Sequence, residues 1–228
     1  MSAHQKDNST GEAKIRLRRA VLAAAPPGPV VLETHGGFGR IYDRTWFKAS
    51  TGLVMEKVEE KAEALARQRA TWRVYQADSL KLLQAGVARD MRFDIVDLDP
   101  YGSPIEYLDA LASTDRQWPD RWQLVVKDGL RKRLRLGVAW STPRMHAYVR
   151  RHGNNLYPVY LQVVREIVEE FAASIGFSVV GWHAYATGEW GDMTHYWAKL
   201  ARLVEKPGSV ADPGQGGKAR KKKPAGAG

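Results

Sequence analysis

The sequence contains no cysteine and no long apolar run. Without cysteine, disulfide bonds, cysteine-ligated zinc sites and mechanisms that begin with attack by a thiolate are excluded. No stretch approaches the roughly 20 apolar residues that a membrane-spanning helix requires, and the polar residues 1–11 lack the apolar run of a secretory signal peptide. We therefore expect a soluble, cytoplasmic protein.

Acidic residues are in the minority, with 25 Asp and Glu against 35 Lys and Arg, and the formal net charge is +10. Residues 206–228 hold six Lys and Arg against Asp212, so this Gly-, Pro- and Ala-rich segment carries about half of that charge. Such a segment is either a solvated, disordered end or a segment that follows phosphate groups. Two further basic clusters, 131–135 and 150–152, lie in the part expected to fold. Together they favour nucleic acid as the partner.

The length of 228 residues and the hydrophobic content of 44% suffice for one substantial core. We expect a flexible N-terminus at residues 1–12, one domain at 13–205 and a disordered basic tail at 206–228.

Short apolar and β-branched runs alternate with segments of helical character, which predicts an α/β sheet. The runs that predict strands are 30–33, 52–56, 72–76, 93–98, 123–126, 177–182 and 196–203. Residues 59–70 are rich in strong helix formers, and 157–174 places apolar residues at helical spacing. The last two strands are too close for a crossover helix, so they should form an antiparallel hairpin. Five parallel strands followed by such a hairpin resemble the Rossmann-like Class I methyltransferases.

The first predicted strand ends at Glu33 and runs into a turn that contains Gly36, Gly37 and Gly39. Glycines let the backbone approach a ligand closely. The segment resembles the first motif of S-adenosylmethionine-dependent methyltransferases, an acidic residue followed by three alternating glycines. It departs from that motif because Gly36 is displaced by one position and His35 stands where a glycine is usual. A tight turn without a ligand is the alternative.

Two further strands also end in carboxylates, at Glu56 and at Asp78, which Ser79 follows. The carboxyl edge of an open α/β sheet is where ligands bind. In the methyltransferase pattern the first position accepts hydrogen bonds from the ribose hydroxyls, and the second faces the adenine amino group. Taken singly, each residue could instead be a solvated charge at a strand end or a helix cap.

The most specific segment is an apolar strand that runs into Asp97, Leu98, Asp99, Pro100 and Tyr101. It resembles the Asp-Pro-Pro-Tyr type of motif in amino methyltransferases, with Asp97 assigned to the cofactor and Asp99, Pro100 and Tyr101 to catalysis. An amine conjugated to a base ring is a poor nucleophile, so it must be oriented and relieved of a proton. Asp99 and the Pro100 carbonyl would accept its N–H groups, and Tyr101 would stack on the base. The alternative is an Asp-Pro turn with Asp99 as a helix cap and Tyr101 in the core.

The sequence of residues 99–104, Asp-Pro-Tyr-Gly-Ser-Pro, is similar to the Asp-Pro-Phe-Gly-Ser-Pro signature of the tRNA guanine N2-dimethyltransferase family. Residues 148–153 and 195–200 also resemble segments of that family, and the resemblance covers about 30–203. It implies an N-methyltransferase that acts on guanine N2 of tRNA or another structured RNA. The chain departs from the family because it lacks the large C-terminal domain that grips tRNA and has residues 127–131 in place of the family's motif after the fifth strand.

Several alternatives remain open. Enzymes that methylate carbon 5 of a pyrimidine generally use a cysteine, so nitrogen is the favoured acceptor here. A DNA adenine or cytosine amino methyltransferase, a small-molecule N-methyltransferase and a catalytically silent nucleic-acid-binding subunit are the rival functions. The scattered histidines show no paired spacing for a metal, and we expect none. Trp46, Trp140 and Trp190 are candidates for base stacking.

Overall fold

The computed structural model describes residues 10–49, 51–136 and 143–204. The predicted basic tail, most of the predicted flexible N-terminus and Trp140 lie outside these ranges. Among the described residues, no helix combines the length and the apolar character needed to cross a bilayer.

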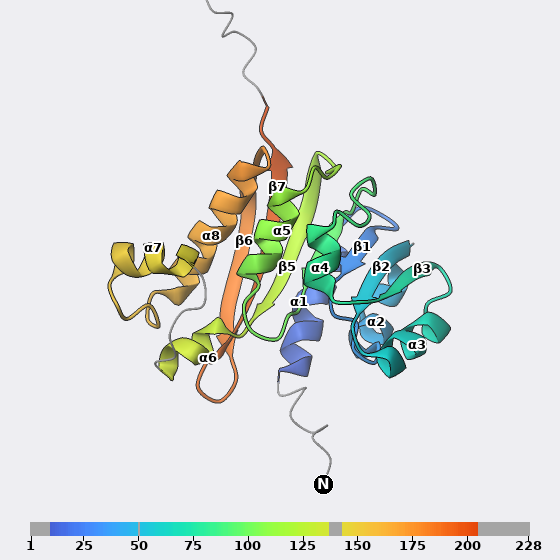
Figure 1. Cartoon of the computed structure of the whole chain (residues 1–228), viewed down its shortest axis with the longest axis horizontal. Coiled ribbons are helices and arrows are strands. Elements are labelled where there is room, and N and C mark those ends of the chain that lie inside the picture. The colour runs from blue at the N-terminus through green and yellow to red at the C-terminus, as the bar shows by residue number, and fades with distance from the viewer. Residues whose placement is uncertain (1–9, 50, 137–142, 205–228) are drawn as a thin grey trace, which may run out of the picture.

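The described residues build one sheet of seven strands in the order β3-β2-β1-β4-β5-β7-β6 (Figure 1). Strands β1 to β5 are parallel, β7 is antiparallel to β5, and β6 is antiparallel to β7. The strands are β1 Val30–Glu33, β2 Thr51–Glu56, β3 Trp72–Gln76, β4 Ile95–Leu98, β5 Arg121–Asp128, β6 Phe177–Thr187 and β7 Met193–Arg202. The predicted mixed sheet with its terminal hairpin is confirmed.

Helices cover both faces of the sheet (Figure 1). They are α1 Gly11–Ala23, α2 Arg40–Arg44, the 3-10 helix η2 Trp46–Lys48, α3 Glu59–Gln68, α4 Ser79–Gln84, α5 Ile105–Ser113, α6 Leu130–Arg135, α7 Pro143–His152 and α8 Tyr160–Ser174. Because side chains alternate along a strand, neighbouring strand residues enter different cores. Leu32 and Val96 pack with α4, α5 and α8, whereas Val31 and Ile95 pack with α1, η2 and α3.

Helix α1 was not predicted from the sequence, and it begins inside the segment expected to be flexible. Its buried side chains include Ile15, Leu17, Arg18 and Val21. A buried arginine interrupts the apolar stripe by which an amphipathic helix is recognised, which hides the helix from a search for hydrophobic periodicity. Helix α1 packs over β7 and β5 and closes one side of the site described below.

Candidate functional site

A cavity of about 610 Å³ opens where the parallel strands end. Seven of the predicted site residues line it: Gly36, Gly37, Glu56, Asp78, Ser79, Asp99 and Tyr101. The cavity is also lined by Lys14, Thr34, His35, Phe38, Arg40, Lys57, Val58, Tyr107 and Lys127. The structure thus brings together residues that lie up to 113 positions apart in the chain.

The glycine turn after β1 is shaped by its neighbours. A Cβ atom on Gly36 would lie 2.5 Å from Leu65 Cδ1 and 2.6 Å from Val54 Cγ2, so only glycine fits between the turn and the core. Gly37 has φ +54°, a conformation that glycine adopts without cost. The Gly37 amide donates to Glu56 Oε2 at 2.9 Å, which fixes this carboxylate against the turn.

Gly39 does not line the cavity. It is the N-cap of α2 with φ +80°, and a Cβ atom there would collide with Gln68. Its glycine character is therefore explained by the backbone and by packing against α3.

Glu33 and Asp97, both predicted to bind the cofactor, are buried in ion pairs away from the cavity. Arg69 Nη1 donates to Glu33 Oε2 at 2.5 Å. Arg18 binds Asp97 through both carboxylate oxygens, at 2.6 and 2.5 Å, and Trp46 Nε1 donates to Asp97 at 3.0 Å. Burial raises the pKa of Glu33 and of Asp97, and these cations oppose that shift. Neither residue reaches the cavity because both side chains lie on the same face of the sheet as Val31 and Ile95, which is covered by α1, η2 and α3.

Trp46 is fully buried in that same core. It cannot stack on a base, so the prediction for this tryptophan was wrong. Trp190 is exposed at the tip of the β6–β7 hairpin, where Arg135 lies 5.7 Å from its ring centroid.

Asp99 lies at the end of the cavity beneath three cations. Lys14 Nζ donates to both of its oxygens, at 3.1 and 2.7 Å, while Arg18 and Lys127 each approach to 3.8 Å. Burial opposes ionisation of Asp99, but these positive charges outweigh it and hold its pKa below the usual value. Asp99 is thus a carboxylate that stays ionised inside a largely enclosed site.

Pro100 and Tyr101 follow directly on this carboxylate. Lys127 Nζ donates to the Pro100 carbonyl at 3.3 Å and lies 5.4 Å from the centroid of the Tyr101 ring. Tyr101 is 76% exposed, so it is not the core residue of the alternative reading. Its ring lines the cavity, with the ammonium group of Lys127 beside it.

His35 occupies the position where the motif usually has glycine. Its Nδ1 lies 2.9 Å from Thr34 Oγ1, and its Nε2 lies 3.3 Å from Ser79 Oγ and 3.2 Å from the Tyr107 hydroxyl. Burial lowers the pKa of His35, which favours the neutral ring. Ser79 therefore holds the imidazole in place at the floor of the cavity.

Asp78 combines two of the roles considered for it. Its Oδ1 accepts from the Lys81 amide at 3.2 Å and so caps α4, and Lys57 Nζ lies 3.5 Å from its Oδ2. The hydrogen bond from the Lys81 amide is the main cause that lowers the pKa of Asp78. The cap leaves the carboxylate at the cavity wall.

The sequence pattern did not predict Lys14, Arg18, Tyr107 or the role of Lys127 at this site. No motif marks these residues, which reach the site from α1, α5 and β5. The one available signal was the density of basic residues in 14–19, which lies beyond the expected disordered end.

No protein-family model and no curated protein matches the sequence. Solved structures do match. The chain is similar to M. jannaschii TYW2 in complex with AdoMet, with 14% identity, 84% of this chain and 77% of that chain covered, and a TM-score of 0.53. It is also similar to the N-methyltransferase NodS of Bradyrhizobium japonicum in complex with S-adenosyl-L-homocysteine, with 11% identity, 88% and 90% covered, and a TM-score of 0.56.

These similarities show that the fold is the Rossmann-like methyltransferase fold, as expected from the order of the strands. The identities are too low to show more than the fold. The resemblance of residues 99–104 to the tRNA guanine N2-dimethyltransferase signature is not confirmed by these comparisons and stays a prediction.

Proposed function

We propose that this chain is an S-adenosylmethionine-dependent N-methyltransferase that acts on the exocyclic amine of a nucleic-acid base. The observation that carries the proposal is Asp99, an ionised carboxylate at the end of the same cavity that Glu56 and Asp78 line. The Pro100 carbonyl and the exposed ring of Tyr101 adjoin it. These are the acceptors and the stacking surface that an aromatic amine requires.

The cavity fits the cofactor on its own geometry. Gly36 lets the turn pack closely on the core, the space beside Gly37 is open, and Glu56 offers two carboxylate oxygens for the ribose hydroxyls. Asp78 would face the adenine amino group, with Val58 and Phe38 as apolar neighbours, and the cations Lys14 and Arg40 would meet the carboxylate of the amino-acid moiety. When bound, S-adenosylmethionine supplies an electrophilic methyl group. Both neighbouring structures described above contain this cofactor or its product.

Asp99 and the Pro100 carbonyl would hold the substrate amine by its two N–H groups. In the structure these acceptors are engaged by Lys14 and Lys127. The substrate amine would therefore replace an ammonium group at Asp99, and the two lysines would stay nearby as counter-charges. Asp99 would orient the nitrogen lone pair and stabilise the positive charge that develops as nitrogen gains the methyl group. One N–H proton of the methylated nitrogen then passes to solvent, which leaves a neutral amine and an ionised Asp99.

Guanine N2 of tRNA or another structured RNA is the substrate that we favour. Two observations support this substrate: the sequence similarity of residues 99–104 to the family signature, and the basic residues of the folded part. Helix α6 alone carries Arg131, Lys132, Arg133 and Arg135. A catalytically silent subunit would have no chemical use for an ionised, largely enclosed Asp99. DNA and small amines are separated from RNA by the experiment below.

The test is methyl transfer from labelled cofactor to unmodified tRNA and to unmethylated duplex DNA in parallel, followed by digestion to nucleosides. Asp99→Asn keeps the shape of the side chain and removes its charge, and we expect it to lower kcat at least about 100-fold. Asp90→Asn, an exposed carboxylate outside the cavity, is the matched control and should retain activity. Calorimetry with S-adenosyl-L-homocysteine checks that both variants still bind the cofactor.

Label in N2-methylguanosine that is lost in Asp99→Asn supports the proposal. Label in adenine or cytosine of DNA retains the chemistry and overturns the substrate. Absence of label from both, with the cofactor still bound, overturns the assignment to nucleic acid.

A further inference from the structure

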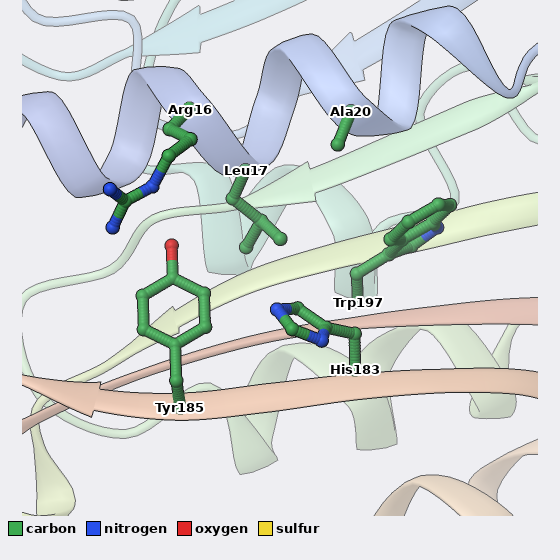
Figure 2. Close-up of a pocket in the computed structure, with 6 residues that line it drawn as sticks. All are labelled: Arg16, Leu17, Ala20, His183, Tyr185 and Trp197. Atoms are coloured by element: carbon green, nitrogen blue, oxygen red, sulfur yellow. The ribbon is translucent and has the colours of Figure 1, made fainter.

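A second cavity, of about 320 Å³, lies between α1 and the β6–β7 hairpin. It is lined by Arg16, Leu17 and Ala20 of α1, His183 and Tyr185 of β6, and Trp197 of β7. Figure 2 shows the three residues of α1 facing the three aromatic residues of the hairpin. Its volume is at the lower end of the range for small-ligand sites, which suits a ligand the size of one nucleotide.

The aromatic wall follows from the register of the hairpin. His183 pairs with Trp197, and Tyr185 pairs with His195, so these four side chains share one face of the sheet. The His183 and Tyr185 ring centroids are 5.5 Å apart, and Figure 2 shows His183 between Tyr185 and Trp197. The opposite wall is the small and aliphatic pair Leu17 and Ala20. A slot lined by aromatic rings on one side and by aliphatic side chains on the other accommodates a flat ring.

Positive charge adjoins this slot. Arg16 is exposed on α1 and extends toward the Tyr185 hydroxyl (Figure 2). Lys199 Nζ lies 5.0 Å from the centroid of the Trp197 ring. None of the six lining residues is acidic. A flat ring joined to an anionic group therefore matches the cavity better than an aliphatic chain or a cation does.

The second cavity is tied to the first through α1 and through the sheet. Lys14 lines the first cavity and Arg16 the second, and the Tyr185 hydroxyl donates to the Ala13 carbonyl at 2.9 Å. On the sheet, Lys127 pairs with His195, and His195 pairs with Tyr185. Two strand spacings, about 10 Å, therefore separate the backbone of a residue beside Asp99 from that of a residue in the second cavity.

We propose that the second cavity binds a nucleotide of the substrate strand next to the one that is methylated. Its base lies between the aromatic wall and α1, and its phosphate meets Arg16. The inference rests on the proposed function. It assigns recognition of a flanking nucleotide to the second cavity, and base-modifying enzymes use such contacts to select the sequence around the target base.

Photo-crosslinking tests the location directly. An unmodified tRNA transcript that carries 4-thiouridine is irradiated with the full-length protein, and the crosslinked peptides are identified by mass spectrometry. We expect crosslinks at His183, Tyr185 or Trp197. Crosslinks confined to other parts of the chain would overturn the inference.

Two variants test the contribution to binding. We expect Arg16→Gln and His183→Ala each to weaken tRNA binding about 10-fold, from loss of a phosphate contact and of a stacking surface respectively. The matched controls are Arg73→Gln on β3, the opposite edge of the sheet, and His146→Ala on α7, both exposed. Affinity for S-adenosyl-L-homocysteine should be unchanged in all four variants, which shows that the first cavity and the fold are intact.

The outcomes separate this inference from the proposed function. If tRNA is methylated and the cavity variants behave like their controls, the inference is wrong and the function stands. If tRNA crosslinks to the second cavity but receives no methyl group, the proposed function is wrong and the nucleotide site stands. If wild-type protein does not bind tRNA, both are wrong. Guanosine monophosphate that competes at the affinity of tRNA would overturn the assignment to a substrate strand.

Discussion

Asp97 and Asp99 are two residues apart, and their surroundings give them different roles. Asp97 is bound by Nε and Nη2 of Arg18 and by Nε1 of Trp46 in a fully buried position. Asp99 faces a cavity and is held by the flexible side chain of Lys14. A lysine on a four-carbon stem can move away from its partner, whereas a bidentate arginine in a packed core cannot without a large cost. Asp99 is therefore the carboxylate available to a substrate.

Removal of Lys14 should change the pH dependence of catalysis. Lys14 helps to hold the pKa of Asp99 below its usual value, so the carboxylate is ionised above that low pKa and activity is lost as the pH falls through it. In Lys14→Met the pKa rises, and we expect the acidic limb of kcat, measured at saturating cofactor, to move to higher pH. Lys48→Met, which removes an exposed lysine near Phe47, is the control. An unshifted acidic limb in Lys14→Met would contradict the assigned role of Asp99.

Asp128 is a buried carboxyl group whose titration affects stability. Burial raises its pKa to about 6 from 3.8, although the Tyr160 hydroxyl donates to it at 2.7 Å. Because the folded-state pKa is the higher one, the folded state is favoured at low pH, and this stability is lost as the pH rises from about 4 to about 6. The loss amounts to about 3 kcal/mol.

We therefore expect Asp128→Asn to change less in its free energy of unfolding between pH 4 and pH 6.5 than the wild-type protein does. Urea denaturation at the two pH values measures this difference. Asp115→Asn, at an exposed position, should follow the wild type. Parallel behaviour of Asp128→Asn and wild type would show that Asp128 does not titrate in this range.

Among the elements, α1 contributes most to the site relative to its length. It supplies Lys14 to Asp99, Arg18 to Asp97 and one wall of each cavity. A helix that places a buried arginine against two carboxylates is fixed in position by charge as well as by apolar packing. Movement of α1 would thus alter both cavities together.

Arg18→Met should destabilise the protein because it leaves Asp97 buried without its cation. The expected loss is about 3–5 kcal/mol in the free energy of unfolding by chemical denaturation. The second substitution Asp97→Asn in the same chain removes the unpaired charge and should restore part of that loss. Arg19→Met, on the exposed side of α1, should cost little. An equal effect of Arg18→Met and Arg19→Met would show that the buried pair does not anchor α1.

At the scale of the whole molecule, the sheet collects the functional side chains at one edge. The parallel strands β1 to β5 all end on the same side, and the β6–β7 hairpin turns there too, next to α6 (Figure 1). The basic residues of α6 and the exposed Trp190 therefore lie at the edge where the first cavity opens. Under the proposed function, a nucleic acid would contact this edge while one of its bases enters the cavity.

The basic tail allows a test of whether electrostatic contacts to phosphate groups contribute to nucleic-acid binding. If residues 207–228 follow phosphate groups, the logarithm of the tRNA binding constant should fall more steeply with the logarithm of salt in the full-length protein than in a chain that ends at residue 206. The tail has five Lys and Arg in this range, and each phosphate contact contributes about 0.7 to the slope for a single strand. Equal slopes would assign the tail no contact with phosphate, and the basic residues of the folded part would carry the binding alone.

The sequence by itself determined the order of the strands along the chain, two of the helices, and several of the segments that meet at the site. Apolar periodicity identified all seven strands, and three of them, β1, β3 and β6, begin at the predicted residue. Position at a strand end was enough to select Glu56, Asp78 and Asp99, because parallel strands bring their carboxyl ends together. These are local signals, and a chain with a strong hydrophobic pattern carries them in any context.

Only the tertiary structure decided which carboxylates face the cavity and which are neutralised within the core. Glu33 and Asp97 look like site residues in the sequence, yet Arg69, directly after α3, and Arg18 of α1 bind them in the core, away from the cavity. The three cations around Asp99 come from α1 and β5, and the aromatic slot needs α1 to lie against the hairpin. Such contacts depend on side chains far apart in the chain, and their energies depend on burial, which no local pattern specifies.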